Sequence, residues 1–61
     1  MKKHEIRVNF KPELHDGHMQ YMWQVVLITN DGIFTVGHGW SEWIDDALLD
    51  ALDWAESNIG D

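Results

Sequence analysis

The chain has 61 residues, a formal net charge of −7 and no cysteine. A chain of this length supports one small domain, over residues 1–61, whose core is marginal because it buries only about 60% of the unfolded surface. The lack of cysteine excludes disulfides and thiolate zinc sites. A hydrophobic fraction of 44% with four tryptophans excludes a disordered chain.

The charges are distributed unevenly. All four basic residues lie in the first eleven positions, and ten of the eleven acidic residues follow them. Nucleic-acid binding is driven by Lys and Arg side chains that neutralise phosphates, so we expect no direct nucleic-acid partner. No apolar run approaches the ~18 residues of a membrane span, and the N-terminus does not resemble a signal peptide. We therefore expect a cytoplasmic protein without a membrane partner.

The first predicted element is a strand over residues 4–10, in which apolar and polar side chains alternate. Residues 11–19 contain the only proline and a glycine, so we expect a connecting loop there. Residues 20–29 are rich in aromatic and β-branched residues and are predicted to form the central, best-buried strand.

A hairpin is predicted between this central strand and a third strand over residues 33–40. The Asn30-Asp31-Gly32 segment suits a two-residue turn on Asp31-Gly32 or a three-residue loop with Gly32 in the left-handed region. The two options differ by one residue of register, and both stay open. Gly37 and Gly39 indicate a bulge or a close backbone approach near the end of the third strand.

The last element is a helix predicted over residues 42–57, with Ser41 as its N-cap. Six apolar residues fall on one stripe that should cover the sheet: Ile44, Ala47, Leu48, Ala51, Leu52 and Ala55. The fold class is therefore α+β, with a three-stranded antiparallel sheet in β-β-β-α order covered by one C-terminal amphipathic helix.

The opposite face of this helix is acidic and is the main candidate site. Its carboxylates are Glu42, Asp45, Asp46, Asp50, Asp53 and Glu56. Like charges four residues apart destabilise a helix by a few tenths of a kcal/mol, and no lysine relieves them here. The face either keeps a small domain in solution or binds a basic protein partner, in the manner of a nucleic-acid mimic.

Apolar residues beside the acidic face extend the candidate site. Trp43 and Leu49 could anchor a partner, and together with Trp54 they could form a homodimer contact. The alternative is that the tryptophans cover the sheet edge and that Leu49 is a single surface leucine.

No catalytic, cofactor or metal site is expected. The chain has no cysteine and no Gly-rich phosphate loop, and its serines are explained by the helix ends. His15, Asp16 and His18 lie close together, but a transition-metal site usually needs three or four supported ligands. We expect a protein that is not an enzyme.

Two families resemble this chain. Residues 23–56 (WQVVLITNDGIFTVGHGWSEWIDDALLDALDWAE) resemble the later part of a double-stranded-RNA-binding domain, in which two strands, small residues and Ser precede a helix with regularly spaced alanines. That family's phosphate-binding lysines correspond here to Glu42, Trp43, Asp45 and Asp46, so the resemblance implies the fold and not RNA binding. The order of elements also resembles small antitoxins of the HicB kind, which implies neutralisation of a basic ribonuclease.

Overall fold

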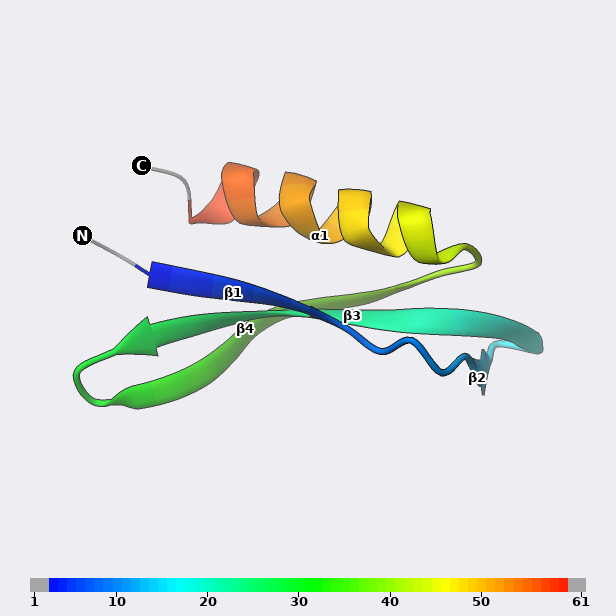
Figure 1. Ribbon diagram of the computed structural model, residues 1–61, viewed down its shortest axis with the longest axis horizontal. Coiled ribbons are helices and arrows are strands. Elements are labelled where there is room, and N and C mark those ends of the chain that lie inside the picture. Colours follow the sequence, from blue (N-terminus) through cyan, green and yellow to red (C-terminus); the bar gives the residue numbers. More distant parts are fainter. Residues whose placement is uncertain (1–2, 60–61) are drawn as a thin grey trace.

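The computed structural model describes residues 3–59 as a four-stranded antiparallel sheet with one helix (Figure 1). The elements are β1 (Lys3–Val8), β2 (Glu13–His15), β3 (His18–Thr29), β4 (Gly32–Ser41) and α1 (Ile44–Asn58). β1 and β4 pair with the long central strand β3, β2 pairs with the start of β3, and α1 lies across one face. The α+β class is confirmed, with one strand more than predicted.

The additional strand lies in the segment predicted to be a loop. β2 pairs with His18–Gln20 of β3 around a two-residue turn at Asp16-Gly17. Both turn residues have positive φ, 52° and 80°, a conformation that Asp tolerates and Gly adopts freely. The loop prediction was wrong because Asp16-Gly17 is itself a hairpin turn, and the paired segments beside it are short, with one apolar residue each, Leu14 and Met19.

The β3–β4 hairpin has a register different from both sequence options, although Gly32 has the positive φ, 142°, that the three-residue option predicted. Thr29 lies opposite Gly32, so the turn residues are Asn30 and Asp31. The Thr29 hydroxyl accepts a hydrogen bond from the Asp31 N–H at 3.1 Å and donates one to the Gly32 carbonyl at 3.2 Å. This side-chain stabilisation of the turn moves it one residue earlier than the Asp-Gly signal indicates.

The glycines of β4 make the close approach that the sequence indicated. A β-carbon on Gly37 would lie 2.6 Å from the Trp54 ring, and one on Gly39 would lie 2.5 Å from the Trp23 ring. The register also shifts between Val25 and Val26 of β3, so the expected bulge is present as well. The missing side chains let two indoles pack directly against the backbone.

The core between α1 and the sheet is small. Its buried residues are Trp23, Val25, Ala47, Ala51 and Ala55. The three alanines confirm the predicted inner stripe, and their short side chains allow the helix to lie close to β3. Leu48 and Leu52 were expected to cover the sheet but are 47% and 46% exposed. Both leucines lie at the border of the apolar stripe, and this border extends beyond the edge of the core.

The helix also begins later than predicted. Ser41 is the last residue of β4 and is buried, whereas the N-cap position belongs to Trp43, which makes no side-chain capping hydrogen bond. The sequence interpretation of Ser41 as the N-cap was wrong because Ser41 ends β4 two residues before the N-cap position, and its hydroxyl donates a hydrogen bond to the Asp50 carboxylate instead of accepting one from a backbone N–H of the first helical turn.

Candidate functional site

A shallow groove lies where β4 ends and α1 begins, and we call it the junction groove. It is lined by Gln20, Trp40, Ser41, Glu42, Trp43, Asp46 and Asp50. Three carboxylates from the predicted acidic face thus lie beside two indoles. The acids and Trp43 were predicted from the sequence, whereas Trp40 and Gln20 belong to the sheet and were not predicted.

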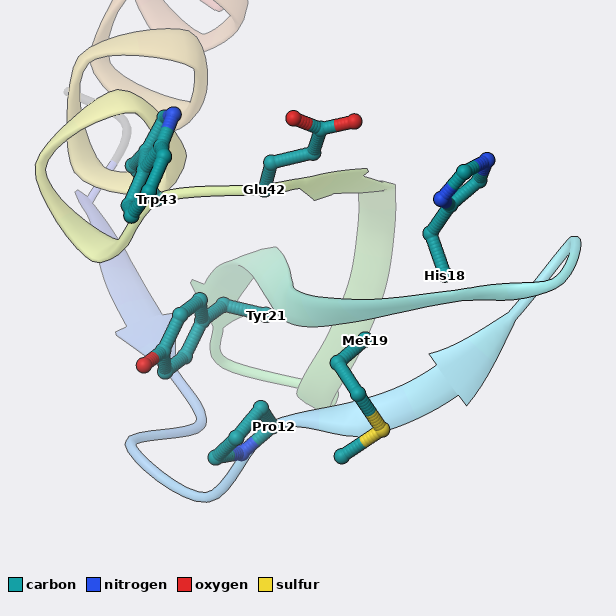
Figure 2. A pocket seen from close by; sticks show the side chains of 6 residues that line it. All are labelled: Pro12, His18, Met19, Tyr21, Glu42 and Trp43. Carbon is teal, nitrogen blue, oxygen red and sulfur yellow. The ribbon is translucent and has the colours of Figure 1, made fainter.

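A second depression, shown in Figure 2, shares Glu42 and Trp43 with the junction groove. Its lining residues are Pro12, His18, Met19, Tyr21, Glu42 and Trp43. Glu42 and Trp43 come from the link between β4 and α1, and the other residues come from the start of β3 and the chain before β2. Glu42 and Trp43 therefore line both depressions.

Trp43 is prominent because of its backbone position. It has extended dihedral angles, φ −121° and ψ 143°, immediately before the first helical turn, and its side chain is 68% exposed. An exposed indole presents a large apolar face with one polar group, which suits contact with another molecule.

The opposite wall of the groove is held by the β2–β3 arm. The His15 ring stacks on Trp40 with a centroid distance of 4.2 Å and an interplanar angle of 8°. The Gln20 side-chain amide donates a hydrogen bond to the His15 carbonyl at 2.7 Å. These contacts fix Trp40 and Gln20, and they depend on the strand pairing that the sequence analysis did not predict.

Asp50 has a structural contact in addition to its place in the groove. The buried Ser41 hydroxyl donates a hydrogen bond of 2.6 Å to the Asp50 carboxylate. This bond joins the end of β4 to the second turn of α1. Asp50 therefore stabilises the contact between β4 and α1 in addition to lining the groove.

The structure divides the predicted acidic face into separate parts. Glu42, Asp46 and Asp50 line the junction groove. Asp45 lies on the other side of the helix, in a depression with Val8, Phe10, Ile44 and Leu48. Three more predicted site residues are exposed and line neither of these depressions: Leu49, Asp53 and Glu56.

The tryptophans predicted to lie together are also divided. Trp54 is half-buried and packs on Gly37, as the sheet-covering alternative predicts. Trp43 is exposed and lines the grooves, so it does not cover the sheet edge.

No cation compensates the groove carboxylates within residues 3–59. The ion pairs found in this part of the chain join Glu5 to Arg7 at 3.2 Å and Asp16 to His15 at 3.4 Å, both away from α1. The acidic row predicted from the sequence thus keeps its uncompensated charge in the folded chain.

The histidines do not gather into a metal site in the described residues. His15 and His18 are cross-strand partners at the turn end of the β2–β3 arm, and Asp16 contacts His15. Within residues 3–59, no group of three or more His, Cys, Asp or Glu side chains is placed to hold a metal ion.

Comparison of the chain with protein families, curated proteins and solved structures found no match. The resemblances to double-stranded-RNA-binding domains and to HicB-type antitoxins therefore rest on residue pattern and order of elements alone. The single helix of the described chain is too short and too polar to cross a membrane.

Proposed function

We propose that this protein is a non-enzymatic interaction protein that binds a basic protein partner through the junction groove. The observation that carries the proposal is the convergence of Glu42, Asp46 and Asp50 with Trp40 and Trp43 in one groove. Carboxylates pair with Lys or Arg, and an indole face attracts the same cations. The chemistry of the groove therefore suits a lysine or arginine side chain of the partner.

The arrangement supports binding to protein over binding to nucleic acid. Phosphates would meet three carboxylates at this surface, and no Lys or Arg occurs after Lys11. We further propose that the partner handles nucleic acid and that this protein inhibits or modulates it in the cytoplasm, by occupying a surface that otherwise meets phosphates. Such a role fits a protein encoded by a phage or mobile element.

Two charge-matched variants test the proposal. Glu42→Gln/Asp46→Asn removes two carboxylates from the groove, and Asp53→Asn/Glu56→Gln removes two outside it, so both change the net charge equally. Titration of an arginine-rich peptide at low and moderate salt should show a loss of affinity of about tenfold for the groove variant only. The same pair of variants can then be used to capture basic proteins from a host lysate.

Equal losses in the two variants would contradict the proposal. That outcome would mean that net charge attracts the peptide without a defined site. Unchanged binding in the groove variant would contradict it as well.

A further inference from the structure

Within residues 3–59, the outer strand β1 pairs on one side only, with β3, and its other edge is free. The register shows which backbone groups lie on that edge. The Asn9 N–H donates to the Met22 carbonyl at 2.9 Å, one step beyond the Val8–Trp23 pair. In an antiparallel ladder, alternate residues direct both backbone groups to the same neighbour. Residues 3, 5 and 7 therefore bond to β3, and residues 4, 6 and 8 direct their N–H and C=O groups away from the sheet.

An exposed apolar strip runs beside this edge, on the helix side of the sheet. Phe10 is 78% exposed, and it borders a depression with Val8, Ile44 and Leu48. α1 runs back over the sheet antiparallel to β1 (Figure 1). Leu52 lies four residues after Leu48 and therefore on the same side of the helix. A free strand edge next to exposed apolar side chains favours association with another strand.

We propose that β1 pairs antiparallel with β1 of a second copy of this chain, so that two sheets join into one across a two-fold axis. When two identical strands pair across a two-fold axis, a residue n positions after the axis lies opposite the residue n positions before it in the other copy. The hydrogen bonds between the copies come from residues 4, 6 and 8, because only these have free backbone groups. The axis then passes beside one residue of β1, and the side chains select which one.

Charge complementarity selects the register centred on Ile6. In that register Glu5 lies opposite Arg7 of the second copy, twice, and Lys3 lies opposite Asn9. Centring on Glu5 would oppose Glu5 to itself and Lys3 to Arg7, and centring on Arg7 would oppose Arg7 to itself. Opposite charges across strands stabilise a pair of strands and like charges destabilise it. Centring on His4 would also oppose Lys3 to Glu5, but it pairs only residues 3–5 within β1. The Ile6 register thus pairs all six residues of β1 and forms two ion pairs without a like-charge contact.

The same register covers the apolar strip. Because both helices lie on one face of the joined sheet, Leu48 and Leu52 of the two copies face each other above β1, with Ile6 opposite Ile6. The junction groove borders β4 and lies away from this contact. Dimerisation therefore leaves it accessible, and the dimer does not depend on the proposed partner.

Charge reversals test the pairing and its register. Glu5→Arg places an arginine opposite Arg7 of the second copy, and Arg7→Glu places a glutamate opposite Glu5. Each variant alone should therefore dimerise about tenfold more weakly or worse. An equimolar mixture of the two should regain dimers, because each arginine then faces a glutamate. Both native side chains are about half exposed, so the variants should remain folded. Sedimentation equilibrium and native mass spectrometry measure the dimer, and circular dichroism confirms the fold.

The mixture shows whether the effect of the two variants comes from pairing between chains or from the Glu5–Arg7 contact within one chain. Arg7 and Glu5 are already 3.2 Å apart in a single chain, and neither variant restores that contact in the mixture. Glu13→Arg makes the same charge change on β2 and should leave the dimer intact. A wild-type monomer at high micromolar concentration would overturn the proposal. The proposal would also be overturned if the mixture dimerised no more strongly than each variant alone, or if Glu13→Arg weakened the dimer as much as Glu5→Arg does.

Discussion

The two borders of α1 are attached to the sheet in different ways. Along the β4-side border, Trp54 packs on Gly37 and Asp50 accepts a hydrogen bond from buried Ser41. Along the β1-side border, Leu48 and Leu52 remain about half exposed. On the β4 side, Gly37 has no side chain to hold the helix away from the strand, so the helix is fixed there. On the β1 side, the helix leaves apolar side chains exposed.

This difference explains why Leu48 and Leu52 remain exposed although the core is small. Short alanines and glycines bring backbone and indoles into contact on the β4 side, which substitutes for a larger set of aliphatic side chains. The cost is that the larger side chains of the stripe extend beyond the sheet. A domain of this size commonly gains stability by covering such surface with a partner or a second copy.

The largest effect is expected from a change that separates helix and strand on the β4-side border. Gly37→Ala would place a β-carbon 2.6 Å from the Trp54 ring, and the indole must move. Overpacking of this kind costs about 2 kcal/mol, which lowers the melting temperature of a small domain by roughly 10 °C. Thermal unfolding followed by circular dichroism measures it. The neighbouring exposed residue provides a control, His38→Ala, and an equal shift in both would contradict the packing argument.

An intermediate effect is expected at the hydrogen bond of the same border. Asp50→Ala leaves the buried Ser41 hydroxyl without its acceptor and should reduce the free energy of unfolding by about 1 kcal/mol. Asp46→Ala removes an acid one turn earlier and should have almost no effect, since it only relieves repulsion along the helix. Urea denaturation of both variants tests this. If they are equally stable, the Ser41–Asp50 bond does not hold the helix.

The smallest effect on the isolated chain is expected at the β1-side border. Leu48→Gln should change the free energy of unfolding by about 0.5 kcal/mol at low protein concentration, because half of the side chain already meets water. If a second copy covers this border, the wild-type melting temperature rises with protein concentration, and the variant loses that dependence. A loss as large as that of Gly37→Ala at low concentration would show that the two borders do not differ.

Part of the acidic site was predictable from residue spacing. The uncompensated row on α1 follows from a helical period applied to a segment without Lys or Arg, and the structure leaves those acids exposed. The division of the row was not predictable. Whether Asp45 or Asp46 faces the junction groove depends on how the helix lies over β4, which no local pattern specifies.

The sequence by itself determined the elements whose signals are local: the central apolar strand, the amphipathic helix with its alanine stripe, and the close approach at Gly37 and Gly39. Only the tertiary structure decided the features that depend on distant partners. β2 forms because residues 13–15 pair with the start of β3, and the Ser41 hydroxyl donates a hydrogen bond to Asp50 at 2.6 Å instead of capping the helix. Long-range pairing and hydrogen-bond competition are set by the whole fold, so a pattern read along the chain does not contain them.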